Sequence, residues 1–178
     1  MSYTRKFQRG HEQSDGRKFA GRTLQQSVWA AAAAAGLLLN PAAAFAANLI
    51  TKADGTQLNA VNNVTQIYAD KIVGNAAVNT FKDFRVEANN IVNMYFKTSA
   101  DASVESNNLV NFVNSRVIID GTVNSVYNSK IGGNLYFLST DGFAVGRSGV
   151  INAGSLYAAT PGSDFMKTYQ KYVADNDA

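Results

Sequence analysis

The sequence predicts an all-β fold, a parallel β-helix in which the chain coils so that short strands stack, and three observations lead to this prediction. Short apolar runs alternate with glycines near the C-terminal end, a six-residue motif occurs twice, and asparagine is frequent along the chain. A coiled fold of this kind needs straight segments separated by sharp corners. It also places equivalent positions of successive coils above one another.

The clearest pattern lies in residues 132–161, which read GGNLYFLSTDGFAVGRSGVINAGSLYAATP. The strands expected there are 135–138, 143–145, 150–151 and 156–159, and the residues between them include Asp141, Gly142, Gly146, Gly149 and Gly154. Each run is too short for an ordinary helix and is rich in β-branched and aromatic residues, and glycine tolerates the positive φ of a corner. The spacing predicts three strands per coil of roughly 20 residues, with coils about 4.8 Å apart.

An internal repeat supports the same fold. Residues 89–94, NNIVNM, are matched by residues 107–112, NNLVNF, at an offset of 18, which we interpret as about one coil. A second match joins 121–124, GTVN, to 149–152, GVIN, at an offset of 28, which is too long for one coil unless a loop intervenes. Stacked coils also give asparagine a use, because amide side chains at equivalent positions can form hydrogen-bonded ladders.

Residues 1–46 read as an extended signal peptide. A long basic start is followed by twelve mostly apolar residues, Val28–Leu39, and then by Ala44-Phe45-Ala46, so cleavage is expected before Ala47. A transmembrane anchor is the alternative, but twelve helical residues span ~18 Å against a hydrocarbon core of ~30 Å. The chain is therefore divided into a signal peptide at 1–46, a β-helical domain at 47–162 and a short helix with a truncated connection at 163–178.

The first part of the expected domain differs from the coils. Two short strands, 48–51 and 64–68, lie on either side of Asp54-Gly55. We expect them to form an N-terminal cap, because the end coil of a solenoid otherwise exposes its backbone and core. Phe81 and Phe84 follow, and they are interpreted as core residues at the start of a coil rather than as a binding platform.

The last residues change character. Ser163–Asp175 has a candidate N-cap in Ser163, apolar residues at helical spacing and two lysines on the opposite face; these are Phe165, Tyr169, Tyr172 and Val173, with Lys167 and Lys171. This pattern predicts a short amphipathic helix. The chain then stops without a coil-closing pattern, which suggests a fragment of a longer protein.

Charge and composition exclude several classes of function. Residues 1–46 hold six basic and two acidic side chains, and the remainder holds ten basic and eleven acidic ones, so the basic character belongs to the leader and nucleic acid is not an expected partner. The chain has no cysteine, and its one histidine, His11, lies in the leader. A histidine triad, a thiolate site and a zinc site are therefore excluded from the domain, and no cofactor or metal is expected.

Acidic side chains would be needed by a β-helical polysaccharide lyase or hydrolase. The candidate acids of the expected domain are scattered singly along the chain; they are Asp70, Asp83, Glu87, Asp101, Glu105, Asp120 and Asp141. Asp120 and Asp141 each precede a glycine, where a role in a turn is sufficient. The glycines of GFAVGRSG lack the lysine and hydroxyl residue of a phosphate loop. We therefore expect no catalytic residue and a protein that is not an enzyme.

Three segments together carry a resemblance to a known family. They are NTFKDFRV at 79–86, NLVNFVNSRVIIDGTVNS at 108–125 and the glycine-rich stretch at 132–161. The series resembles the haemagglutination-activity, or secretion, domain of two-partner-secreted filamentous adhesins, and within that group the leukotoxin-type filamentous adhesins. The long charged leader is similar to the extended signal peptides of type V secretion.

The resemblance implies a right-handed parallel β-helix with an N-terminal cap, secreted to the cell surface by way of the periplasm. It also implies a partner, an outer-membrane β-barrel transporter whose periplasmic domains engage this domain before it nucleates the folding of a longer adhesin that binds a host-cell surface protein or glycan. Candidate turn or partner-recognition residues are Asp141, Gly142, Gly149, Asn152 and Gly154. Many family members have Asn-Pro-Asn-Gly at the first of these turns, where this chain has Ser139-Thr140-Asp141-Gly142.

Three classes of function remain open at this point. The first is a non-enzymatic secretion and adhesion module; the second is a β-helical carbohydrate-active enzyme; the third is a structural surface fibre that uses another export route. A complete reading frame with a long run of repeats, beside a gene for an outer-membrane barrel, would distinguish the first from the other two.

Overall fold

The computed structural model describes residues 46–176, and these contain thirteen strands and one helix. The strands are β1 (Leu49–Lys52), β2 (Val64–Ala69), β3 (Lys71–Val73), β4 (Ala76–Val86), β5 (Ile91–Thr98), β6 (Asn108–Val113), β7 (Val117–Ile119), β8 (Thr122–Tyr127), β9 (Lys130–Ile131), β10 (Asn134–Ser139), β11 (Phe143–Val145), β12 (Val150–Asn152) and β13 (Ser155–Ala159), and the helix is α2 (Ser163–Asp175). The four strands expected between residues 135 and 159 are confirmed as β10 to β13, and the domain is predominantly β-structure.

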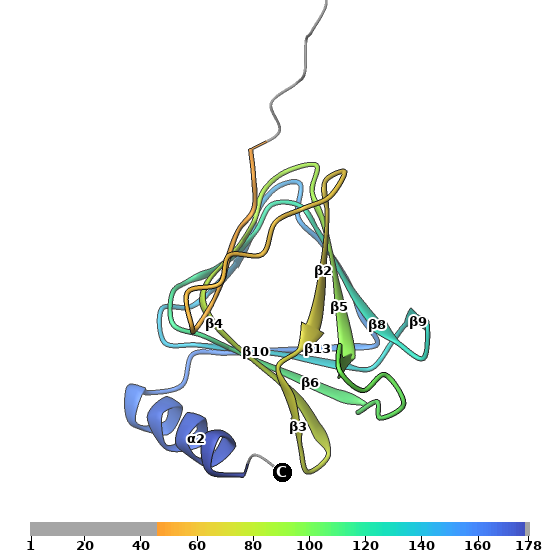
Figure 1. Ribbon diagram of the computed structural model, residues 1–178. Helices are drawn as coiled ribbons and strands as arrows, with labels where there is room; N and C mark the ends of the chain where they lie inside the picture. Colours follow the sequence, from red (N-terminus) through yellow and green to blue (C-terminus); the bar gives the residue numbers. More distant parts are fainter. Residues whose placement is uncertain (1–45, 177–178) are drawn as a thin grey trace, which may run out of the picture. The chain divides into compact units, whose positions relative to one another are not determined.

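The strands of the described part lie on three sides of a triangular outline (Figure 1). The first side holds β2, β5, β8 and β12; the second holds the start of β4 with β6, β10 and β13; the third holds the end of β4 with β7 and β11. Neighbouring strands on each side are parallel, and the chain visits the three sides in turn. We call one passage over the three sides a circuit, and successive circuits are stacked.

The register corrects the interpretation of the internal repeat. Thr122 pairs with Val150 and Asn124 with Asn152, so the offset of 28 joins strands that are stacked in successive circuits. The motifs at 89–94 and 107–112 instead belong to β5 and β6, on two adjacent sides of the same circuit. The offset of 18 is therefore the step from one side to the next, and a coil is longer than expected.

The additional residues are concentrated at one corner, between the first and second sides. The chain covers this corner with residues 70–75, 99–107 and 128–133 in its first three circuits, whereas the fourth uses only Ala153 and Gly154. We call these three segments the extended corner. β3 and β9 belong to it, and both project away from the triangular outline (Figure 1).

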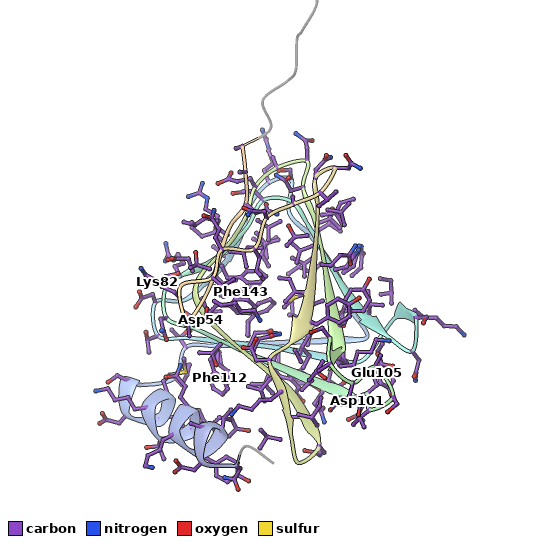
Figure 2. The ribbon with its side chains drawn as sticks, in the orientation of Figure 1. Asp54, Lys82, Asp101, Glu105, Phe112 and Phe143 are labelled. Atoms are coloured by element: carbon purple, nitrogen blue, oxygen red, sulfur yellow. The ribbon has the colours of Figure 1, made fainter. Side chains whose placement is uncertain are left out.

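The interior of the stack is apolar and rich in aromatic rings. Phe84 lies at its centre, with ring centroids 5.1 Å from those of both Phe81 and Phe137 in edge-on arrangements. All three side chains are buried, as the expectation of core residues at Phe81 and Phe84 required. Figure 2 shows Phe143 pointing into this interior, where it contacts the ring of Phe137. Such close packing supplies most of the stability of a stacked fold.

The N-terminal end is covered on two of its three sides, and by a different pair of strands from the one predicted. β1 lies antiparallel against the end of β4, and β3 lies antiparallel against its start. β2 pairs in parallel with β5 and so belongs to the first circuit. The prediction that 64–68 is a cap strand is therefore wrong. This segment belongs to the first circuit, because its buried and outward-facing residues alternate and so fit the first side of the stack.

The predicted helix is confirmed over Ser163–Asp175, although its details differ. Gly162 is the N-cap, and Ser163 makes no capping hydrogen bond. Met166 and Val173 are buried against the outer surface of the second side, whereas Phe165 and Tyr172 are each 54% exposed. The face that docks is thus rotated from the expected one. Phe112 points from the sheet toward the helix (Figure 2), and its ring centroid lies 5.1 Å from that of Tyr169.

Candidate functional site: the open end of the stack

The two ends of the stack are built differently. At the C-terminal end, β11, β12 and β13 each pair with one strand of the preceding circuit, and no other strand of residues 46–176 pairs with their outer edges. We call this the open end. Unpaired backbone N–H and C=O groups along a strand are ready to pair with another strand.

Side chains at the open end occupy core positions without being buried. Leu156 lies in register with Leu135, and Val145 lies in register with Ile119. Leu135 and Ile119 are fully buried, whereas Leu156 is 41% and Val145 46% exposed. The interior therefore continues to the open end and is left uncovered there by the described residues.

A ladder of amide side chains runs along the first side and ends at Asn152. Asn93 Nδ2 donates to Gln66 Oε1 at 3.3 Å, Asn124 Nδ2 to Asn93 Oδ1 at 2.9 Å, and Asn152 Nδ2 to Asn124 Oδ1 at 2.9 Å. These bonds confirm the predicted asparagine ladder. The Oδ1 of Asn152 accepts no hydrogen bond from residues 46–176 and so ends the ladder with a free acceptor.

An aromatic stack runs along the second side in the same way. The rings of Tyr136 and Tyr157 are stacked with centroids 4.6 Å apart and planes 10° from parallel. Tyr157 belongs to the last circuit and is 50% exposed. Apolar contacts, amide groups and aromatic rings thus all reach the open end in a regular register.

At the N-terminal end, a lysine side chain contacts polar partners on neighbouring segments. Lys52 extends from β1, and its Nζ lies 2.6 Å from Asp70 Oδ1 and 2.7 Å from Asn79 Oδ1. The same ammonium lies 4.5 Å from the centroid of the Phe81 ring. Burial lowers the pKa of Lys52, and the charge of Asp70 opposes that shift. Lys52 thus adds a cation to the end that β1 and β3 cover, whereas the outer edge of β2, on the first side, pairs with no other strand of residues 46–176.

The candidate recognition residues lie at different corners of the last circuits. Asp141 and Gly142 form the turn between β10 and β11, Gly149 precedes β12, and Gly154 precedes β13. Gly142 has the positive φ expected of it, +97°. These residues do not converge on one pocket, because each corner of the triangle holds a different one; Asn152 lies in the amide ladder.

Gly149 is required by close approach of two circuits. A Cβ at this position would overlap the carbonyl oxygen of Ile119 and lie 2.6 Å from Cγ1 of Val145. The N–H of the next residue, Val150, donates to the carbonyl of Gly121 at 2.9 Å. The corner before the first side is therefore tightly stacked, unlike the extended corner.

The expected cleavage site is only partly described. Ala44 lies outside the described residues, and Ala46 and Ala47 are exposed. The carbonyl of Ala46 accepts a hydrogen bond of 2.8 Å from the buried carboxamide of Asn90. Asn48, also buried, accepts from the N–H of Glu87 at 2.9 Å. The chain is thus hydrogen-bonded to the rest of the domain from Ala46 onward.

Sequence reasoning did not find the extended corner as a site. Its first two segments, together with Tyr127 of β8, line a hollow of about 270 Å³; the lining residues are Ile72, Gly74, Asn75, Val104, Glu105, Ser106, Asn107 and Tyr127. The offset of 28 between GTVN and GVIN was the sequence evidence for an extended corner, because a circuit of that length contains more residues than three short strands need. No three histidine, cysteine, aspartate or glutamate residues gather into a metal-binding group anywhere in 46–176, and that range has no helix of the length and apolarity needed to span a membrane.

In comparisons with known proteins, no family model, no curated protein and no solved structure matches the chain.

Proposed function

We propose that the chain is the N-terminal secretion domain of a large filamentous surface adhesin and that its stacked circuits form a right-handed parallel β-helix. In this proposal it reaches the periplasm through its signal peptide and leaves the cell through an outer-membrane β-barrel partner, whose periplasmic domains engage it. On the cell surface it nucleates the folding of the remaining adhesin, which carries the contact with a host-cell surface ligand. Its role is not enzymatic.

The difference between the two ends is the observation that carries the proposal. β1 and β3 cover two sides of the N-terminal end, and Lys52 adds a cation there. The open end presents three strand edges in one register together with Leu156, whose counterpart Leu135 is buried. A single added strand satisfies one edge, whereas an added coil satisfies all three. An added coil therefore gains more pairing at the open end than at the N-terminal end, which is the direction in which a nucleating domain would extend.

The energetic gain from one further coil is appreciable. Covering partly exposed core residues such as Val145 and Leu156 contributes about 1 kcal/mol each from apolar burial. Extending the amide ladder from Asn152 adds about 1 kcal/mol for each net hydrogen bond. These terms favour a coil that follows directly in the chain, because loop-closure entropy is then small.

The export step is tested by expressing the full chain with and without an outer-membrane barrel transporter of the two-partner secretion type. We expect protein in the culture medium only when the barrel and its periplasmic domains are present. Release that is independent of the barrel would contradict the export route. Retention of the chain in the periplasm despite an active barrel would contradict it as well.

The nucleating step is tested with two substitutions of similar exposure at opposite ends. Leu156 at the open end is 41% exposed and Leu49 at the N-terminal end is 45% exposed. In the adhesin of which this chain would be the first part, we expect Leu156→Lys to reduce the protease-resistant material on the cell surface. Leu49→Lys is the matched control and should leave it unchanged. Equal effects of the two substitutions would contradict a role for the open end.

A further inference from the structure

The extended corner contains more chain than the fold requires. The fourth circuit turns between the first and second sides with only Ala153 and Gly154, whereas the second uses residues 99–107. Ordering additional residues costs conformational entropy, about 1–2 kcal/mol for each residue fixed. Long ordered loops carried by a regular scaffold commonly bear a binding function.

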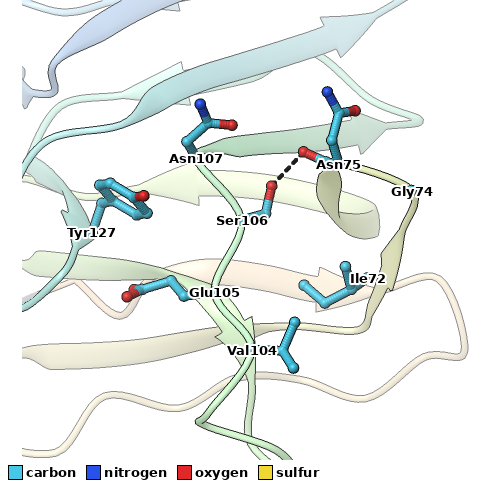
Figure 3. Close-up of a pocket in the computed structure, with 8 residues that line it drawn as sticks. All are labelled: Ile72, Gly74, Asn75, Val104, Glu105, Ser106, Asn107 and Tyr127. Atoms are coloured by element: carbon cyan, nitrogen blue, oxygen red, sulfur yellow. Dashed lines mark hydrogen bonds between the residues drawn. The ribbon is translucent and has the colours of Figure 1, made fainter.

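The three segments of the extended corner are held together by specific hydrogen bonds. Ser106 Oγ donates to the carbonyl of Asn75, joining the second circuit to the first (Figure 3). The N–H of Asn128 donates to Glu105 Oε2 at 3.1 Å, joining the third circuit to the second. The hollow between them is therefore bounded by residues whose relative positions are fixed.

The lining of the hollow combines an apolar part with polar groups, one of which, Glu105, is charged. Figure 3 shows Tyr127 and Glu105 on one flank, with Ile72 and Val104 on the other. Tyr127 is held against the core by Phe96, with ring centroids 5.7 Å apart. Val104 is 49% exposed, so part of the apolar surface is available to a ligand.

Several polar groups of the lining have no partner within residues 46–176. The carboxamide of Asn75 makes no side-chain hydrogen bond, and the Nδ2 of Asn107 donates none. The carboxylate of Glu105 uses Oε2 for Asn128, which leaves Oε1 without a hydrogen bond. Of the eight lining residues, Glu105 alone carries a charge.

We propose that this hollow binds a neutral pyranose ring of a glycan. A pyranose has an apolar C–H face and a rim of hydroxyl groups, each both donor and acceptor. Tyr127, Ile72 and Val104 offer an apolar surface for the ring face. The amides of Asn75 and Asn107 offer donors and acceptors for the hydroxyl groups, and the carboxylate of Glu105 accepts from them. The glycan site is independent of the proposed export function.

The test uses protein purified from the periplasm of cells that express the full chain. The ¹⁵N-labelled protein is titrated with the methyl β-glycosides of glucose, galactose, mannose and N-acetylglucosamine. At least one of them should give saturable shifts in the amides of 70–75, 99–107 and Tyr127, which line the hollow, with a Kd of about 1–10 mM. Absence of saturable shifts with all four glycosides would overturn the proposal.

Two variants separate binding from folding. Asn75→Ala removes a carboxamide that makes no hydrogen bond within the described residues, and Glu105→Gln keeps an acceptor for Asn128 while removing the charge. Each should weaken binding of the sugar about tenfold with little change in unfolding midpoint. Asp175→Asn, at the end of α2, is the charge-matched control and should bind as the unsubstituted protein does. Unchanged binding in both corner variants would contradict the assignment.

A basic peptide is the main competing ligand, because Glu105 could accept a cation. The peptide acetyl-Val-Arg-Val-amide is therefore titrated under the same conditions. We expect it to cause no saturable shifts at the extended corner. Tighter binding of this peptide than of every glycoside would overturn the proposal.

Discussion

The Nζ of Lys52 lies 2.7 Å from the Oδ1 of Asn79. This lysine is the first member of a series of hydrogen-bonded side chains that begins at the N-terminal end of the stack. Asn79 Nδ2 donates in turn to Asn111 Oδ1 at 3.0 Å, and Asn111 Nδ2 donates to the carbonyl of Tyr136 at 2.9 Å. Both asparagines are fully buried. The interior thus carries a connected series of polar side chains among its apolar ones, and the members of this series depend on one another.

Stability should depend on pH through Lys52. Burial lowers its pKa below the ordinary value of 10.5, so the folded protein releases this proton more readily than the unfolded chain. The unfolded state therefore binds more protons as the pH approaches 10.5, and the free energy of unfolding should rise through that range. Urea unfolding between about pH 8 and pH 10 measures this slope.

Lys52→Gln is the control for the pH dependence, because glutamine can still donate to Asn79 and has no proton to lose in this range. Its unfolding free energy should have a flatter profile than that of the unsubstituted protein. Burial and the neighbouring Tyr68 raise the pKa of Tyr95, which acts in the opposite direction at higher pH. Measurements are therefore compared below pH 10. Parallel profiles for the two proteins would refute the role assigned to Lys52.

Removing one amide from the interior should be costly. Asn111→Ala leaves the buried Asn79 Nδ2 without its acceptor, and an unsatisfied buried donor costs about 1–3 kcal/mol. Asn152→Ala removes an exposed amide at the open end and should cost less than about 1 kcal/mol. Chemical denaturation of both variants gives the comparison, and similar losses would show that burial of the amide series is unimportant.

The tight corner at Gly149 should reject a methyl group. Gly149→Ala places a Cβ against the carbonyl of Ile119, so the two circuits must separate locally, at a cost of about 1–3 kcal/mol. Gly132→Ala is the matched control, because a Cβ there would meet no atom within 4 Å. The expected result is a lower thermal midpoint for the first variant only. An unchanged midpoint in Gly149→Ala would disprove the close approach.

The turn at Gly142 should tolerate no β-branched residue. Gly142→Val forces φ near +97° on a valine, which costs about 1–3 kcal/mol, whereas Asp141→Asn preserves the turn chemistry and should cost little. Thermal midpoints and culture-supernatant levels of both variants are measured in cells that express a barrel transporter of the proposed type. We expect Gly142→Val to lower both. Loss of export in a stable Asp141→Asn variant would instead identify Asp141 as a partner-contact residue.

The leader should be removed before Ala47. Ala44 and Ala46 supply the small residues that signal peptidase requires, and Ala46→Arg should therefore block processing. Intact-mass measurement of periplasmic or secreted protein distinguishes the two forms. Unsubstituted protein that retains residues 1–46 would rule out the assigned site.

Much of the strand pattern could be predicted, because glycine and turn residues mark each end of β10 to β13 in the sequence itself. The length of a circuit could not. NNIVNM and NNLVNF belong to different sides, and their matching residues face opposite ways: Val92 and Met94 of β5 enter the interior, whereas Val110 and Phe112 of β6 face α2. The extended corner varies in length from circuit to circuit and so conceals any constant period.

The orientation of α2 also escaped prediction, since its aromatic residues form the larger apolar surface in the sequence. The helix packs through Met166 and Val173 because they fit beside Val110 and Phe112. That choice depends on the shape of a surface contributed by distant strands. The hollow at the extended corner is similar, since three segments separated in the sequence come together only through stacking.

The direction of the hydrogen bonds between circuits has a mechanical consequence. Strands such as β10 and β13 run across the axis of the stack, and the bonds that join them run along it. A force that pulls the chain away from the open end therefore breaks these hydrogen bonds one after another. It does not load all of them at once in shear. Such a stack yields by peeling its last circuit first, and the circuits beneath remain folded while it lengthens.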